Sequence, residues 1–270
     1  MIESLSDILI VTDIDGILLW EKQGISKENL AAIKRFVGKG GHFTISTGRA
    51  IDSTKEILSK VPINAPSIHI NGGYFYDWKT EKILYPNYVS TNAKSYCKAI
   101  VEKFPFCDCH FVNEKSVNLM TSGEVLRKYI PSREFNFFSG SFEAIPDNAY
   151  KFIVCCDMEH MDEVREYAKS VCKDDVLLIQ SSEFFLEVLP PQNSKGRALE
   201  KLCEMLNIPA ENSVGVGDFE NDIEMLRAAG IGAAVDNAQE KVKEAADVVL
   251  PACEENAIAH LISFLEEMYE

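Results

Sequence analysis

Four short apolar runs constrain this chain most strongly, because each is rich in β-branched residues and ends abruptly in polar or glycine-rich residues. Strands that are covered on both faces have this composition, since no position along them needs a polar side chain. The pattern therefore predicts strands of a buried parallel sheet. The four predicted strands cover residues 8–12, 42–46, 67–70 and 213–216.

Helical segments separate these strands. The stretch 26–37 begins at Ser26, a residue type that caps helix N-termini, and stops at Gly38. The alternation of strands and helices predicts an α/β fold, with a Rossmann-like parallel-sheet core and right-handed crossovers. The other predicted helices of this core cover residues 52–60, 194–206 and 222–229.

The middle of the chain has a different pattern. Helical periodicity and strand-like runs alternate there in a way that predicts an α+β domain, and the first pattern resumes after Pro190-Pro191. We therefore expect a core from residues 1–84 and 190–270 and an inserted cap domain from residues 85–189. Its predicted helices cover 93–104 and 161–172, and its predicted strands 107–112, 151–156, 176–180 and 184–188.

Composition excludes several classes of function. The 270 residues are 46% hydrophobic, which suffices for a buried core. A net charge of -15 argues against a nucleic-acid partner, which needs a basic surface. The chain starts without a basic segment and long apolar run, and no apolar stretch reaches membrane-spanning length. We therefore expect a cytoplasmic protein with no membrane partner.

Acidic residues follow two of the predicted strands. Asp13 and Asp15 come directly after the first strand, and Asp218 and Asp222 follow the strand 213–216. Ligands of open α/β sheets bind outside the carboxyl ends of the strands, so these four carboxylates should converge there. They would repel one another without a cation. Mg²⁺ fits, because it binds carboxylates, water and a substrate phosphate.

The same crevice has the groups that phosphoryl transfer needs. One carboxylate that is free to react can attack phosphorus, and a second, two residues on, can protonate the leaving group and later activate water. Thr47, which follows the second strand, and Lys195, at the start of a helix, supply a hydroxyl and a positive charge for the phosphoryl oxygens. The sequence thus predicts transfer of a phosphoryl group.

Five ordered motifs resemble those of the haloacid dehalogenase superfamily, and their spacing is similar to the Cof-type branch, which has a large type IIB cap. The run from Gly217 to Leu226 and the later Val235-Asp236-Asn237-Ala238 are especially similar to that branch. The motifs are Asp13-Ile14-Asp15-Gly16, Thr47-Gly48-Arg49, Asn71-Gly72-Gly73, Asn193-Ser194-Lys195-Gly196 and Gly217-Asp218-Phe219-Glu220-Asn221-Asp222.

This resemblance assigns roles to the residues that carry the motifs. Asp13 matches the nucleophile that also binds Mg²⁺, and Asp15 matches the general acid/base, whose carbonyl binds the metal. Thr47 matches the phosphate-binding hydroxyl and Lys195 the lysine that stabilises the nucleophile and the phosphoryl group. The resemblance implies two further metal ligands and four substrate-binding residues, which are Asp218 and Asp222, and Gly48, Arg49, Asn71 and Asn221.

One position departs from the family pattern. Ile17 stands where the family usually has Thr after Asp-x-Asp-Gly, which removes a hydroxyl but none of the groups that perform the chemistry. We therefore expect this change to affect rate or loop geometry and not the class of reaction. The resemblance also implies that residues 18–24 form a small hairpin flap beside the site.

The leading functional hypothesis is an Mg²⁺-dependent phosphatase that hydrolyses a small phosphorylated metabolite, such as a sugar phosphate, through an aspartyl-phosphate on Asp13. The predicted cap favours small substrates, because a lid excludes bulky ones. The alternative within the same chemistry is a phosphomutase-like transferase, which would return the phosphate to its substrate. From another class, a non-catalytic phospho-ligand-binding or signalling protein is the third hypothesis.

Overall fold

The computed structural model describes residues 4–20, 24–113, 117–129, 136–138 and 140–269. The chain divides into two compact units, Met1–Tyr85 with Ser194–Glu270, and Pro86–Asn193. The second division falls after Asn193, whereas the sequence pattern places it after residue 189. The side chain of Asn193 accepts a hydrogen bond of 2.7 Å from Asn87, which joins the two ends of the inserted unit.

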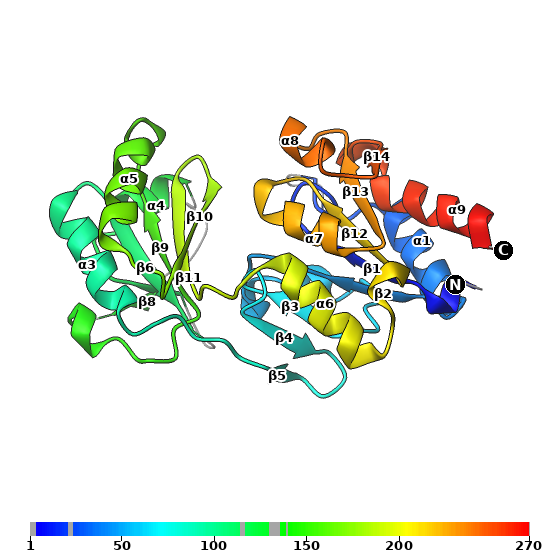
Figure 1. The fold of residues 1–270 in the computed structure, drawn as a ribbon, viewed down its shortest axis with the longest axis horizontal. Helices are drawn as coiled ribbons and strands as arrows, with labels where there is room; N and C mark the ends of the chain where they lie inside the picture. The colour runs from blue at the N-terminus through cyan, green and yellow to red at the C-terminus, as the bar shows by residue number, and fades with distance from the viewer. Residues whose placement is uncertain (1–3, 21–23, 114–116, 130–135, 139, 270) are drawn as a thin grey trace. The chain divides into compact units, whose positions relative to one another are not determined.

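The first unit is built on a parallel five-stranded sheet in the order β14-β13-β12-β1-β2 (Figure 1). The two central strands are in register, with Thr12 opposite Val216. This sheet confirms the predicted α/β core. Its strands are β1 Leu9–Thr12, β2 His42–Ile45, β12 Ser213–Gly217, β13 Ile231–Val235 and β14 Val248–Leu250.

Helices bury the apolar faces of this sheet. Ser26 and Ser194 accept hydrogen bonds from the backbone N–H three residues on, which caps α1 and α6. The last helix, α9, packs against α1 (Figure 1) and buries Leu261 and Leu265. The helices of the unit are α1 Lys27–Gly38, α2 Lys55–Leu58, α6 Lys195–Leu206, α7 Ile223–Ala228, α8 Glu240–Lys243 and α9 Ala257–Tyr269.

One predicted strand of the parallel sheet lies elsewhere. β3 Ser67–His69 pairs with β4 Tyr74–Asp77, which pairs with β5 Lys82–Leu84, in a separate antiparallel sheet. A single bridge between Ser46 and Ile68 links β3 to the end of β2. The physical cause is a tight turn after β3, because positive φ angles reverse the chain and return β4 alongside it. The turn residues are Ile70, Asn71 and Gly72, with φ of 53°, 53° and 95°.

The second unit has a six-stranded sheet in the order β10-β11-β9-β6-β7-β8, with only β7 and β8 parallel. Helices α3 and α5 pack against each other (Figure 1) and share a core with the sheet. The elements are α3 Ala93–Lys103, β6 Asp108–Val112, β7 Val117–Leu119, α4 Glu124–Tyr129, β8 Asn136–Phe137, β9 Lys151–Cys155, α5 Met161–Val171, β10 Leu177–Ser182 and β11 Phe185–Leu189.

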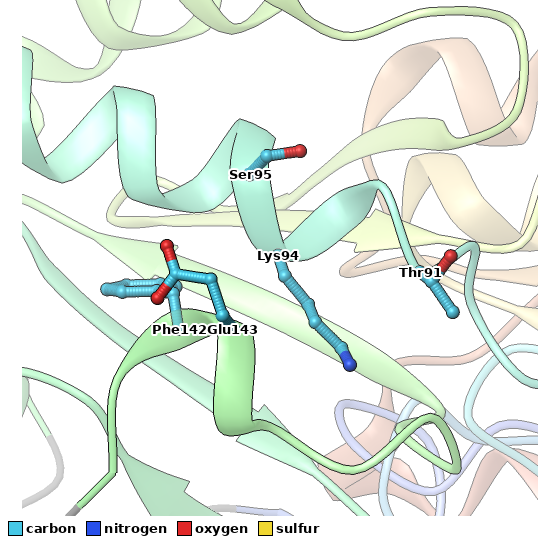
Figure 2. A pocket seen from close by; sticks show the side chains of 5 residues that line it. All are labelled: Thr91, Lys94, Ser95, Phe142 and Glu143. Atoms are coloured by element: carbon cyan, nitrogen blue, oxygen red, sulfur yellow. The ribbon is translucent and has the colours of Figure 1, made fainter.

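A small surface pocket lies in this second unit, beside the first turn of α3 (Figure 2). It is lined by Thr91, Lys94, Ser95, Phe142 and Glu143, none of which belongs to the predicted site. Two of its charged groups pair with neighbours, Lys94 with Asp147 and Glu143 with Lys98. Within the described residues, every helix falls short of the length and apolarity that a membrane span requires.

Candidate active site

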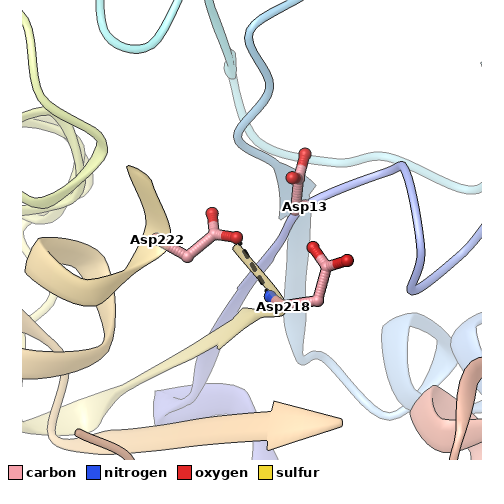
Figure 3. A group of neighbouring side chains, drawn as sticks. All are labelled: Asp13, Asp218 and Asp222. Atoms are coloured by element: carbon pink, nitrogen blue, oxygen red, sulfur yellow. Dashed lines mark hydrogen bonds between the residues drawn. The ribbon is translucent and has the colours of Figure 1, made fainter. Parts of the chain in front are cut away.

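The carboxyl ends of β1 and β12 bring three acids together. Asp13 follows β1 and Asp218 follows β12, and the Asp13 N–H donates to the Val216 carbonyl at 2.9 Å. Asp222 enters from the turn that precedes α7. Asp13, Asp218 and Asp222 each offer a carboxylate oxygen within 4.8 Å of the others (Figure 3). The sequence placed these residues at one sheet edge, and the structure brings them together there.

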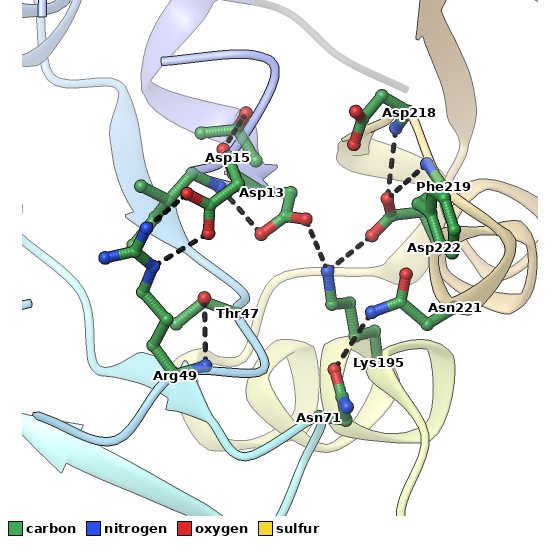
Figure 4. A network of polar contacts seen from close by, with 12 residues as sticks. Asp13, Asp15, Thr47, Arg49, Asn71, Lys195, Asp218, Phe219, Asn221 and Asp222 are labelled. Carbon is green, nitrogen blue, oxygen red and sulfur yellow. Dashed lines mark hydrogen bonds and ion pairs between the residues drawn. The ribbon is translucent and has the colours of Figure 1, made fainter. Parts of the chain in front are cut away.

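Lys195 lies between two of these acids, Asp13 and Asp222 (Figure 4). It is the first residue of α6, and its side chain is fully buried. The Nζ atom is 2.9 Å from Asp13 Oδ2 and 2.6 Å from Asp222 Oδ1. A buried ammonium group between two carboxylates compensates their charge and fixes the orientation of both.

Asp222 uses both of its oxygens within the protein. Its Oδ1 accepts from Lys195, and its Oδ2 accepts from the backbone N–H groups of Asp218 and Phe219, at 3.0 Å each. The side chain is fully buried. Asp222 thus holds the loop after β12 and orients Lys195, while the carboxylates of Asp13 and Asp218 carry fewer hydrogen bonds of this kind.

Burial and mutual repulsion perturb the acids. Burial raises the pKa of Asp13 to about 7, against the attraction of Lys195 and with further repulsion from Asp222 and Asp15. Burial, followed by repulsion from Asp13, raises the pKa of Asp218 to about 8. Burial alone would lower the pKa of Lys195, but the two neighbouring carboxylates raise it. Displaced acid pKa values of this kind mark a place where a cation would be stabilising.

The donor set of this cluster fits magnesium. All of its ligands are carboxylate oxygens, which hard divalent cations prefer, and the described part of the chain contributes no thiolate or imidazole to it. Asp13 and Asp218 would hold the ion, and Asp222, the third acid of the cluster, already accepts hydrogen bonds on both oxygens. The expected carbonyl ligand from Asp15 comes from the residue two positions after Asp13, at the same end of β1.

Asp15 faces a different partner. Arg49 donates to both of its oxygens, from Nε to Oδ2 at 2.8 Å and from Nη2 to Oδ1 at 2.5 Å. The Arg49 backbone N–H in turn donates to the hydroxyl of Thr47 at 3.1 Å, and Thr47 is buried. A bidentate guanidinium–carboxylate pair fixes both planes, so Arg49 sets the orientation of the Asp15 carboxyl group.

Two asparagines connect the loops around the site (Figure 4). Asn221 Nδ2 donates to Asn71 Oδ1 at 3.1 Å, which joins the loop after β12 to the turn after β3. The Asn71 backbone N–H donates to the Thr47 carbonyl at 3.0 Å. At Gly48, a Cβ atom would lie 3.3 Å from Asn71 Oδ1, so the backbone approaches the asparagine closely.

Three residues that the predicted site did not include support the first loop. Gly16 has a φ of 71°, and a Cβ atom there would lie 2.2 Å from Asp218 Oδ2. Asn237 donates to the Gly16 carbonyl at 3.0 Å, and the Cys253 thiol donates to the Ile17 carbonyl at 3.0 Å. The Asp-Gly pair was the sequence signal for Gly16, and Asn237 stood in a motif to which no role had been given.

Ile17, the departure from the family pattern, is fully buried in the core. The apolar side chain at this position therefore packs in the hydrophobic core of the first unit. Of the expected flap at residues 18–24, residues 21–23 lie outside the described part of the chain. In the described residues, isolated β-bridges pair Asp15 with Leu19 and Trp20 with Gly24.

Comparisons with known proteins show the family to which this chain belongs. The model of the haloacid dehalogenase-like hydrolase family matches residues 10–262. The 5-amino-6-(5-phospho-D-ribitylamino)uracil phosphatase YwtE of Bacillus subtilis is 29% identical, over 95% of this chain and 97% of the relative. Pyridoxal phosphate phosphatase YbhA of Escherichia coli is 26% identical and covers 94% of this chain and 97% of its own.

Solved structures show the same fold. A haloacid dehalogenase-like hydrolase from Bacteroides thetaiotaomicron superposes with a TM-score of 0.85 at 22% identity, over 96% of this chain and 99% of its own. A sugar phosphatase of haloacid dehalogenase subclass IIB, BT4131, gives a TM-score of 0.81 at 23% identity, over 96% and 99%. The predicted resemblance is confirmed, and the chain belongs to the haloacid dehalogenase-like hydrolase family, in its Cof-type branch.

Proposed function

We propose that this protein is an Mg²⁺-dependent phosphomonoesterase that hydrolyses a small phosphorylated metabolite through an aspartyl-phosphate on Asp13. The observation that carries the proposal is the contact of 2.9 Å between Asp13 and the fully buried Lys195, inside a cluster of three carboxylates. Burial and mutual repulsion make such a cluster electrostatically unfavourable unless a cation lies beside it. The relatives named as phosphatases of small phosphate esters support the same class of substrate.

The reaction has two half-reactions. In the first, the Asp13 carboxylate attacks phosphorus, the bond from phosphorus to the leaving-group oxygen breaks, and Asp15 gives that oxygen a proton. In the second, Asp15 takes a proton from water as the water oxygen attacks the same phosphorus. Inorganic phosphate leaves and the Asp13 carboxylate is restored.

The other side chains balance charge during these steps. Lys195 lies against the nucleophile and can compensate the negative charge that grows on the transferring phosphoryl group. The buried Thr47 hydroxyl is a further donor for its oxygens. When bound, Mg²⁺ would polarise the phosphoryl oxygens and neutralise the Asp13 and Asp218 carboxylates. Gly48, Arg49, Asn71 and Asn221 are proposed to contact the substrate.

Several finer points belong to the proposal. Residues 1–84 and 190–270 are proposed to be the catalytic part, and residues 85–189 an inserted specificity domain. A sugar phosphate is the preferred substrate, because the large predicted cap favours small ligands. The enzyme is proposed to act in the cytoplasm, without nucleic-acid or membrane partners, and the net charge of -15 supports the first of these exclusions.

Release of inorganic phosphate from a panel of phosphorylated metabolites tests the proposal. We expect hydrolysis in Mg²⁺, none in excess chelator, and recovery when Mg²⁺ is restored. The matched control is Asp13→Asn, which keeps the side-chain shape but removes the nucleophile. Equal activity in chelator would contradict the metal assignment, and return of the phosphate to a second position of the substrate would indicate a mutase.

A further inference from the structure

A buried chain of polar side chains lies behind the Arg49 loop. The indole Nε1 of Trp78 donates to Ser67 Oγ at 2.8 Å, Ser67 Oγ lies 2.8 Å from His69 Nε2, and His69 Nδ1 lies 3.1 Å from the Arg49 carbonyl oxygen. Ser67 and His69 are both fully buried. These residues come from β3 and from the residue after β4, so the chain runs from the small antiparallel sheet to the site.

The chemistry of the two ends fixes where the protons are. A carbonyl oxygen can only accept, so the His69 Nδ1 atom must carry the proton of that contact. A neutral imidazole then has an acceptor at Nε2, and the Ser67 hydroxyl donates to it while accepting from the indole, which can only donate. The longer contact of Ser67 Oγ with the Tyr76 carbonyl, at 3.5 Å, is weaker.

The surroundings keep this imidazole neutral. Burial lowers the pKa of His69 to about 4, against the hydrogen bond to the Arg49 carbonyl, which raises it. No proton is therefore expected on Nε2 at neutral pH. Nε2 then remains the acceptor and Nδ1 the donor in this series of hydrogen bonds. His69 thus differs from a surface histidine, which would exchange between tautomers.

The tyrosine that follows the turn completes a clamp on the Arg49 loop. Tyr74 stacks on His69 with ring centroids 5.3 Å apart, and its hydroxyl accepts from the Ile51 backbone N–H at 2.8 Å. The two rings therefore hold peptide groups on both sides of Ala50. The Ile70 N–H also donates to the Arg49 carbonyl, at 3.3 Å.

The turn that the clamp stabilises has strained backbone geometry. Ile70 is β-branched yet has a φ of 53°, and Asn71 repeats that value. Such positions persist only where surrounding contacts determine them, and they gather at functional sites. Here the strained turn presents Asn71 to Asn221, and the clamped loop carries the guanidinium that holds Asp15.

We propose that His69, as the neutral Nδ1–H tautomer, is a positioning residue that fixes Arg49 and, through the Arg49–Asp15 ion pair, the orientation of the acid/base. This inference deepens the proposed function and rests on it for the role of Asp15. The histidine contacts no substrate in this scheme. Its contribution is to hold the Arg49 peptide group where the guanidinium can reach both Asp15 oxygens.

Three substitutions separate its two hydrogen bonds. His69→Asn keeps a donor near the Nδ1 position, His69→Gln offers an amide near Nε2 instead, and His69→Phe removes both. We expect His69→Gln and His69→Phe to lower kcat by about tenfold for alkyl phosphates and by less for an aryl phosphate, because the latter needs little protonation. His69→Asn should stay within about threefold of wild type. Equal losses of kcat in His69→Asn and His69→Gln would overturn the inference.

A double-mutant cycle distinguishes positioning from a purely structural role. In an Arg49→Ala background, His69→Gln should change kcat/KM by less than about twofold, because the group through which it acts is gone. Additive losses would contradict the proposal. If His69→Phe does not fold, the comparison rests on His69→Asn and His69→Gln, whose thermal unfolding should match that of the wild type.

The tautomer itself can be read by ¹⁵N NMR of the imidazole groups in the wild-type protein, assigned by the signals that His69→Asn removes. We expect the Nδ1–H pattern for His69, unchanged from pH 5 to 8. An Nε2–H pattern or a titration in this range would overturn the inference. This readout needs no activity, so it judges His69 even if Asp13→Asn keeps full turnover and the proposed function fails.

Discussion

Replacing Asp218 by asparagine should stabilise the metal-free protein at neutral pH. Burial, with repulsion from Asp13, raises the pKa of Asp218 from 3.8 to about 8. The unfolded chain loses this proton near pH 4, while the folded protein keeps it until about pH 8. The folded state therefore binds more protons in this window, and the free energy of unfolding falls as the pH rises through it.

The size of the effect follows from the width of that window. From 3.8 to pH 7 is about 3 pH units, each worth about 1.4 kcal/mol, so Asp218 destabilises the metal-free fold by up to about 4 kcal/mol. The pKa of Asp13 is also raised, partly by coupling within the same cluster, so the two acids share this proton uptake. We therefore expect Asp218→Asn to raise the free energy of unfolding by about 2 kcal/mol or more at pH 7. At pH 4 the gain should vanish.

Urea unfolding in excess chelator, at pH 4 and pH 7, measures this difference, and added Mg²⁺ should stabilise the wild type but not Asp218→Asn. The control is Asp236→Asn, because the Asp236 side chain is 70% exposed and should change little. A variant no more stable than wild type at pH 7, or stabilised by Mg²⁺ as strongly as wild type, would refute the reasoning.

Two further substitutions test the charge balance and the close backbone approach. Lys195→Ala leaves two buried carboxylates without their ammonium partner and should lower turnover by about 100-fold or more in steady-state assays; wild-type turnover would remove Lys195 from the site. Gly16→Ala puts a Cβ atom 2.2 Å from Asp218 Oδ2 and should lower Mg²⁺-dependent activity by at least about tenfold. Its control, Gly24→Ala, has a similar φ of 75°, but no atom of the described residues lies within 4 Å of the added Cβ, so equal losses in both variants would contradict the steric argument.

The sequence predicted the core of the site because that part depends on local pattern. A strand that is followed at once by Asp13 and Asp15 needs no long-range information to place its acids at a sheet edge. The same holds for Lys195, which directly follows the capping residue Ser194. In the structure Lys195 contacts Asp13 and Asp222, and a carboxylate oxygen of Asp218 lies within 4.8 Å of theirs.

Contacts between distant residues were beyond this reasoning. The Arg49–Asp15 pair joins residues 34 positions apart, and the bond from Asn237 to Gly16 spans 221 positions. Neither leaves a periodic signal. The strand β13 was not predicted, because Gly232, Ala233 and Ala234 give it little β-branched character, and they leave room for close approach of the Leu226 backbone at Gly232.

The misplaced strand β3 shows a third limit. Its composition suited a buried parallel strand, but the positive φ of Ile70 and Asn71 turns the chain back on itself, and isoleucine gives no warning of such a turn. The turn brings Asn71 into hydrogen-bond contact with Asn221, so this difference from the expected fold affects the proposed substrate-binding residues. Places where local sequence preference and structure disagree are often parts of a functional site, which agrees with the proposed role of this turn.

Mass spectrometry of a trapped intermediate tests the central claim most directly. Asp15→Asn keeps the nucleophile and removes the base that activates water, so mixing it with an aryl phosphate and Mg²⁺ should accumulate phosphoenzyme. The account predicts one phosphate adduct in the intact-protein spectrum, mapping to Asp13, and no adduct in the Asp13→Asn/Asp15→Asn double variant. An adduct on another residue, or full turnover by Asp13→Asn, would contradict it.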